Sequence, residues 1–298
     1  MNSASEILER LLKLYPVKIV KEHFQNLDGS KQSEQLPEVV KKYPASAIEQ
    51  FAFDNIGYTK QHVYIFRLNK KFDRTTFKRA EFPIAIKSEG KFDSDKFYKN
   101  KFTNYVFLCF PVIEYDVSLL NPLSQERVNF IQPTRVVISG QNVVVQTTIM
   151  EKKLDSYFPA NRKVIDVIKR NGEDQFIGQI IKFFQKDYYI QSCDLNKGVK
   201  NLWHHDVVDS RYAKFKKSKS TTTETMDEEY TLKAQYPEIY KEIMAAPMNK
   251  TVFRYLRGDD KFSRTFMVDP SQGELSMAIF PENPDQIWNV INEILAGN

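Results

Sequence analysis

The sequence predicts an α+β protein: a small helical N-terminal domain, residues 1–57, followed by an α+β domain, residues 60–298, of antiparallel sheet with packed helices. Apolar residues recur at helical spacing through the first segment. Apolar and polar residues alternate in β-rich runs after residue 60, and the last fifty residues read as three strands and a helix. The chain has 298 residues, of which 42% are hydrophobic, so it is long enough to bury both cores.

Residues 1–57 are expected to form four helices. Ser3 with Glu6, and Ser46 with Glu49, have the spacing of capping boxes, in which each side chain bonds the other residue's free backbone N–H. Pro16 ends the first helix because a helix interior cannot hold a residue without an N–H.

The segment from residue 60 to 150 is expected to be mostly strands. His62–Leu68 alternates and is rich in β-branched and aromatic residues. Arg135–Ser139 and Asn142–Met150 flank Gly140-Gln141, which suits a tight hairpin because glycine supplies the positive φ at the first turn position.

The second half is expected to contain both helices and strands. Residues 162–186 carry an apolar stripe at helical spacing and predict one long amphipathic helix, with a break at Asn171-Gly172 as the alternative. Residues 214–229 are polar and low in complexity, which predicts an exposed basic loop. A meander over residues 251–280 and a helix capped by Asn283 complete the domain.

The excess positive charge of the chain is concentrated between Arg67 and Lys101. This stretch holds eleven lysines and arginines against five acids, a local charge of +6, whereas the whole chain carries +5. Phenylalanines interleave with these charges, so two interpretations stay open. The rings can stack on unpaired bases while the cations bind phosphates, or the rings can face the core.

The leading hypothesis is a non-enzymatic nucleic-acid-binding protein, a subunit of a larger assembly, which contacts phosphates through a basic surface and needs no cofactor. A protein partner is compatible with it. The residues expected to contact phosphates are Arg67, Lys70, Lys71, Arg74, Lys78, Arg79, Lys214, Lys216 and Lys217.

Residues Leu14–Tyr43 read as a helix, a turn and a second helix, with Gly29-Ser30-Lys31 followed by Glu34 and an apolar helical face. This segment resembles the SAP motif, a helix-extension-helix unit of DNA-binding proteins, and departs from its pattern at Pro37. The resemblance implies that three lysines face phosphates: Lys18, Lys21 and Lys31.

Two other function classes remain open. Asp116, Glu151 and Lys153 resemble the pattern of a nuclease in which carboxylates hold Mg²⁺ and a lysine assists the attacking water. The competing interpretation is a salt-bridged group at a strand end. The third hypothesis is an adaptor that docks on a partner through its N-terminal helices, and an exposed apolar patch there would favour it.

Cysteine and apolar patterns bear on the compartment. The chain has two cysteines without metal-ligand spacing, so no zinc or other metal site is expected, and this usage fits a reducing, intracellular compartment, cytoplasm or nucleus. No apolar run approaches the length of a membrane span, so we expect no membrane partner.

Overall fold

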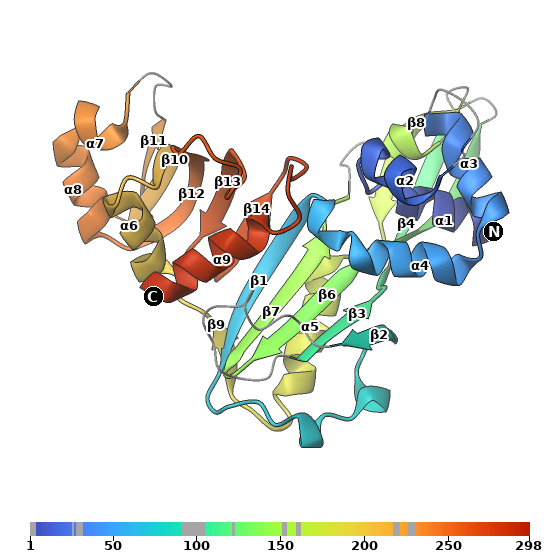
Figure 1. The fold of residues 1–298 in the computed structure, drawn as a ribbon, viewed down its shortest axis with the longest axis horizontal. Coiled ribbons are helices and arrows are strands. Elements are labelled where there is room, and N and C mark those ends of the chain that lie inside the picture. Colours follow the sequence, from blue (N-terminus) through green and yellow to red (C-terminus); the bar gives the residue numbers. More distant parts are fainter. Residues whose placement is uncertain are drawn as a thin grey trace.

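The chain folds as the α+β protein that the sequence predicts, with helices at the N-terminus and a large antiparallel sheet (Figure 1). The computed structural model describes residues 4–25, 27, 32–90, 105–120, 123–150, 154–158, 162–216, 221–225 and 230–298.

Within these residues, eleven antiparallel strands form one sheet, in which β9 pairs with β1 beside the main strand order. In spatial order the strands are β11 (Thr221–Thr225), β10 (Val208–Lys216), β12 (Met248–Tyr255), β13 (Thr265–Asp269), β14 (Glu274–Met277), β1 (Gln61–Leu68), β7 (Asn142–Thr148), β6 (Thr134–Ser139), β3 (Tyr105–Cys109) and β2 (Ile86–Gly90), with β9 (Ile190–Ser192) on β1.

Strand β1 joins the two halves of this sheet. One of its edges pairs with β7 along its length, whereas the other edge pairs first with β14 and then with β9. The change of partner occurs at Ile65, whose N–H donates to Gly273 O and whose oxygen accepts from Cys193 N, both at 2.8 Å. Gly273 has a φ of 68°, and a Cβ there would lie 2.6 Å from Ile65 O. The crossing therefore requires glycine.

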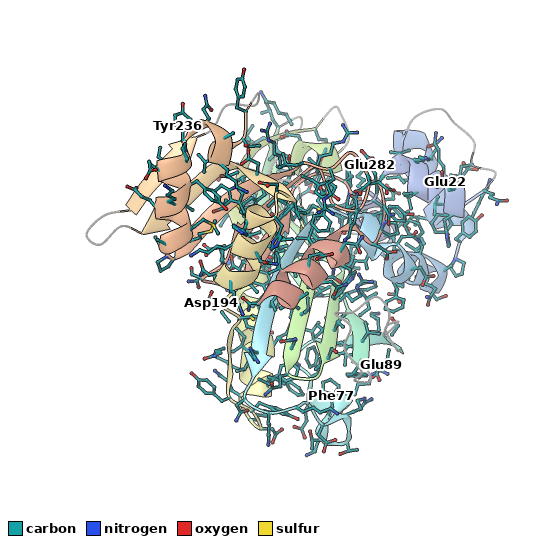
Figure 2. The ribbon with its side chains drawn as sticks, turned by 60° about the vertical axis from the view of Figure 1, so that its left-hand side comes forward. Glu22, Phe77, Glu89, Asp194, Tyr236 and Glu282 are labelled. Carbon is teal, nitrogen blue, oxygen red and sulfur yellow. The ribbon has the colours of Figure 1, made fainter. Side chains whose placement is uncertain are left out.

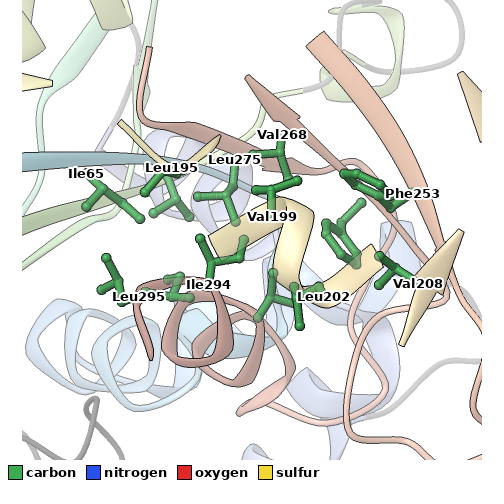
Figure 3. Close-up of a cluster of buried hydrophobic side chains, with 14 of the residues drawn as sticks. Ile65, Leu195, Val199, Leu202, Val208, Phe253, Val268, Leu275, Ile294 and Leu295 are labelled. Atoms are coloured by element: carbon green, nitrogen blue, oxygen red, sulfur yellow. The ribbon is translucent and has the colours of Figure 1, made fainter. Parts of the chain in front are cut away.

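Helices cover both faces of the sheet because successive strand residues point to opposite sides. Val63 and Ile65 of β1 belong to the cluster that includes residues of helices α6 (Asn196–His204) and α9 (Gln286–Gly297). Figure 3 labels Ile65 together with Val199 and Ile294 of these helices. Phe66 and Leu68 point the other way, into a cluster with helix α5 (Glu173–Phe184). The short helices α7 (Leu232–Gln235) and α8 (Pro237–Ala245) lie beside α6 (Figure 1).

The N-terminal helices pack on a second, three-stranded sheet in the order β5-β4-β8. Leu12 and Phe51 share one cluster with Val117 of β4 and Phe130 of β5, so the helices bury their apolar faces against strands from later in the chain. The division at residues 57–60 stays a prediction. The elements are α1 (Ala4–Leu12), α2 (Val17–His23), α3 (Gln32–Lys42), α4 (Ala45–Asp54), β4 (Val112–Leu120), β5 (Ser124–Ile131) and β8 (Lys163–Lys169).

The prediction of one long helix over residues 162–186 is wrong for the first half of that segment. Lys163–Lys169 forms β8, which pairs with β4, and helix α5 begins only at Glu173 after Asn171-Gly172. The run of β-branched Val and Ile residues favours a strand once a neighbouring strand is available to pair with it. The break considered at Asn171-Gly172 is therefore the junction between the two elements.

Of the predicted turns, loop and helix cap, some are confirmed and others are wrong. The hairpin at Gly140 is confirmed, with a φ of 60°. The exposed loop expected near 214–229 is instead, where it is described, the end of β10 paired with β11. The β-branched threonines of the segment Thr221–Thr225, which Glu224 interrupts, supply the strand propensity there. Asn283 is not the N-cap of α9 that the sequence predicts, because the helix begins at Gln286 and Asp285 is its N-cap. Asn283 Oδ1 instead accepts from Asp285 N at 2.9 Å, in the turn before the helix.

Hydrogen bonds to Glu173 join the first turn of α5 to strand β1 and to Gln132. Its carboxylate lies 2.9 Å from His62 Nδ1 and accepts from Tyr64 OH at 2.6 Å and from Gln132 Nε2 at 2.9 Å. Burial alone would raise the pKa of Glu173, but these hydrogen bonds outweigh it and hold the pKa below its usual 4.5.

We expect Glu173→Gln to lower the free energy of unfolding by about 2 kcal/mol at neutral pH, because three donors lose a charged acceptor. The folded pKa lies below the unfolded one, so the carboxylate's stabilisation is complete above about pH 4.5 and is lost as pH falls through the folded value. Urea unfolding of both proteins against pH should show the gap closing under acid. A gap of constant size would contradict this assignment.

Gly198 of α6 allows the close packing of α6 on α9, because a Cβ there would collide with the Ile294 backbone carbonyl. Gly198→Ala should therefore lower the free energy of unfolding by about 3 kcal/mol. Gly178→Ala in α5 is the matched control, since nothing lies within 4 Å of its Cβ position. That variant should gain about 0.5–1 kcal/mol from helix propensity. Equal effects of the two substitutions in chemical denaturation would refute the packing argument.

Candidate nucleic-acid interface

The described part of the basic stretch lies at one end of the large sheet. It begins with Arg67 near the end of β1, continues through a loop with two short 3-10 helices, Arg74–Thr76 and Arg79–Glu81, and ends in β2. This is the lower end of the sheet in Figure 1. Residues 91–104, which hold the remaining cations of the stretch, are outside the described residues.

The described phenylalanines of this stretch belong to the core. Phe77 and Phe82 are each only 7% exposed and lie in the cluster beneath α5. The Phe82 ring centroid is 4.8 Å from that of Phe107 and 5.1 Å from that of Phe183. Neither Phe77 nor Phe82 is available to stack on a base. Phe92, Phe97, Tyr98 and Phe102 lie outside the described residues.

Three of the expected phosphate-binding cations are already paired with acids. Glu89 of β2 accepts from Arg74 at 3.1 Å and lies 3.2 Å from Arg79, and Lys78 lies 3.1 Å from Glu81. The Arg74 guanidinium also lies over the Tyr105 ring, 4.2 Å from its centroid. Figure 2 labels Glu89 and Phe77 at this end of the sheet. These cations lie against local carboxylates and an aromatic ring, so their donor groups are already engaged within the fold.

Arg67, Lys70 and Lys71 are exposed on the same end. Arg67 and Lys70 form no ion pair with any residue that the structure describes. The Lys70 ammonium lies 5.1 Å from the centroid of the Tyr188 ring, a cation–π contact.

The pairing of β1 with β9 places an exposed aromatic ring beside these cations. Arg67 lies opposite Gln191 in the register. The pairing continues through Asn69, whose N–H donates to Tyr189 O at 2.9 Å and whose Oδ1 accepts from Tyr189 N at 3.0 Å. Residues opposite each other, and two apart along a strand, share a face. The Tyr189 side of this face is open, since Tyr189 is 66% exposed.

We call this surface the β1–β9 tip. Its residues are Arg67, Asn69, Lys70, Lys71, Tyr189 and Gln191.

The second group of expected cations lies elsewhere. Lys214 and Lys216 are on β10, opposite Thr223 and Thr221 of β11, and Lys217 lies outside the described residues. Strands β12, β13 and β14 separate β10 from β1. The fold therefore does not bring the two basic groups onto one site.

Asp116, the described carboxylate of the proposed nuclease site, is hydrogen-bonded to two arginines. Asp116 of β4 accepts hydrogen bonds from Arg170, at 2.5 Å to Nε, and from Arg127, at 3.4 Å. The hydrogen bond from Arg170 contributes most to holding the pKa of Asp116 below its usual range. Glu151 and Lys153 lie outside the described residues, and no metal-binding cluster of three or more His, Cys, Asp or Glu side chains occurs in the described part. The Mg²⁺ site stays a prediction.

The N-terminal segment has the two helices that the SAP resemblance implies, α2 and α3, with Pro37 inside α3. Lys18 and Lys21 are exposed on α2, where Lys18 lies 3.8 Å from Glu22, and Lys31 is outside the described residues. The motif itself stays a prediction.

The adaptor hypothesis would be favoured by an exposed apolar patch on the N-terminal helices. Among described residues, helices α1 to α4 carry no exposed large apolar side chain, whereas Ile165, Val167 and Ile168 of β8 are exposed.

No described helix has the length and apolar character needed to cross a bilayer.

Comparison with known proteins assigns no function. Neither a family model nor a curated protein matches this chain. The candidate interface therefore depends on charge, exposure and strand register alone.

Proposed function

We propose that this protein is a non-enzymatic nucleic-acid-binding protein that contacts phosphates through Arg67, Lys70 and Lys71 of the β1–β9 tip. One observation carries the proposal. Arg67 and Lys70 stand exposed and without an acid partner in the described part of the chain, beside an exposed Tyr189 ring, whereas Arg74, Lys78 and Arg79 are paired.

The difference between the two groups of cations is energetic. A lysine that already neutralises a carboxylate gains little by moving to a phosphate, because one ion pair replaces another. An exposed cation without a partner instead releases condensed counterions from the nucleic acid when it binds, which favours association at low salt. The β1–β9 tip is therefore the part of the described basic stretch best suited to phosphates.

Acids near the tip limit its charge. Asp73 follows Lys71 closely in the loop, and its carboxylate accepts hydrogen bonds from Thr75 N at 2.9 Å and Thr75 Oγ1 at 2.7 Å. The bond from the Thr75 side chain contributes most to holding the pKa of Asp73 below its usual range, so it stays ionised at neutral pH. Asp73 therefore lowers the net positive charge around the tip, which suits contact with only a few phosphates.

Tyr189 indicates which form of nucleic acid binds. Backbone hydrogen bonds to Asn69 fix the position of its Cα, and its ring is 66% exposed. A ring in this position can stack on an unpaired base but not on a base inside a duplex. We therefore infer a preference for single strands.

Binding of a single-stranded oligonucleotide should weaken as salt rises. Arg67→Ala and Lys70→Ala should each reduce the slope of log affinity against log salt by about 0.7, the value for one lost phosphate contact on a single strand. Tyr189→Ala should weaken single-strand binding by about 1–3 kcal/mol and leave duplex binding unchanged. Fluorescence anisotropy across a salt series measures all three.

Lys78→Ala is the matched control, since Lys78 lies in the same loop but is paired with Glu81. It should leave both affinity and slope unchanged. Affinity that is independent of salt, or a larger loss in Lys78→Ala than in Lys70→Ala, would overturn the proposal.

A further inference from the structure

A cavity of about 800 Å³ lies in the N-terminal part of the molecule, away from the β1–β9 tip. Its walls come from helix α1, from strand β5, from Tyr157 of the 3-10 helix Leu154–Tyr157, and from Phe158 and Arg162. Strand β5 is an outer strand of its three-stranded sheet, so the cavity lies against an edge strand. Its volume lies in the range of small-molecule sites.

Arg10 is the unusual residue of this cavity. It lines the wall and is only 6% exposed, yet its Nε and Nη2 are buried and donate no hydrogen bond within the described part of the chain. Its guanidinium carbon lies 5.3 Å from the centroid of the Phe130 ring, a contact that leaves the N–H groups unused. Buried donors without acceptors are rare in folded proteins and indicate a missing partner.

The acids around the cavity do not supply that partner. Glu6 and Glu9 lie on the same helix and raise the pKa of Arg10 by their charge, but among the described residues no ion pair joins either of them to Arg10. Glu126 of β5 is already bound by Arg162 at 2.7 Å. Burial is the main cause that lowers the pKa of the Arg10 guanidinium, which means that its charge is poorly solvated without a ligand.

The other cations of the wall have partners. Lys13 Nζ donates to Ser156 O at 2.7 Å, and Arg127 donates to Asp116 at 3.4 Å. Arg162 donates to Glu126 through Nη2 at 2.7 Å, and only its Nε is buried without an acceptor. Arg10 is therefore the cation that an incoming anion would satisfy. Asn129 also lines the cavity, and its Oδ1 is buried without a hydrogen-bond donor.

We propose that this cavity binds a small molecule bearing an oxyanion, carboxylate or phosphate, toward which the buried Arg10 side chain turns so that Nε and Nη2 each donate a hydrogen bond to it. These two N–H groups are parallel and match the spacing of two oxygens on one carboxylate or phosphate. The site is separate from the β1–β9 tip and does not depend on nucleic-acid binding.

The test compares thermal unfolding of the full chain in potassium phosphate, potassium succinate and potassium chloride at matched ionic strength. A ligand that binds only the folded state raises the melting temperature. At least one of the two oxyanions should raise it at millimolar concentration above the value in chloride, and the stronger of the two identifies the preferred group. Equal melting temperatures in all three salts would overturn the proposal.

Variants locate the effect. Arg10→Met keeps an unbranched apolar side chain over Phe130 and should fold, since replacing a buried charge by an apolar group is often neutral or stabilising. Calorimetric affinity for the preferred oxyanion should fall at least about tenfold in this variant, and also in Arg10→Lys, which lacks the paired donors. Lys241→Ala, at an exposed lysine of α8 that is paired with Glu238, is the control and should bind as the wild type does. An undiminished response in both Arg10 variants, or an equal loss in Lys241→Ala, would refute the assignment.

Discussion

The fold depends on the change of partner along strand β1. Ile65 donates to Gly273 and accepts from Cys193, so one residue ties β1 to β14 on one side of this point and to β9 on the other. No residue with a Cβ fits at Gly273, because the Ile65 carbonyl occupies that space. The C-terminal strands, β1 and the strands β7, β6 and β3 thus form one sheet, and helices on both faces cover it.

The candidate interface is a consequence of this arrangement. After β14 ends its pairing, β1 continues toward the basic loop, and β9 takes the free edge. The last register pairs carry Arg67 and Asn69 alongside Gln191 and Tyr189, while Leu68 and Ile190 point into the core beneath α5. The same two strands therefore anchor the sheet with one face and display cations and a ring on the other.

Sequence patterns predicted the parts of the fold that local chemistry determines. Glycine at position 140 specifies a hairpin by itself, and strand β1 lies close to where the alternation of apolar and polar residues indicates. The Lys163–Lys169 segment was misassigned because its residues suit either a helix or a strand, and only pairing with β4 decides. Such non-local pairing leaves no mark in the periodicity of one segment.

The site was less accessible to sequence reasoning. Counting charges located the basic stretch, but the partners of Arg74 and Arg79 depend on Glu89 folding back beside them in β2. Tyr189 is separated from Arg67 by more than a hundred residues, and only the register of β9 on β1 joins them. Arg10 reads as an ordinary polar residue of an amphipathic helix until its burial is known.

Amide hydrogen exchange with and without a single-stranded oligonucleotide tests most directly whether the β1–β9 tip is the binding surface. Amides buried or held by a bound ligand exchange more slowly. We expect slowing confined to residues 67–73 and 187–192, with the β10–β11 pair unchanged. Slowing over residues 208–225 instead, or no slowing at the tip while the oligonucleotide is bound, would contradict the proposed interface.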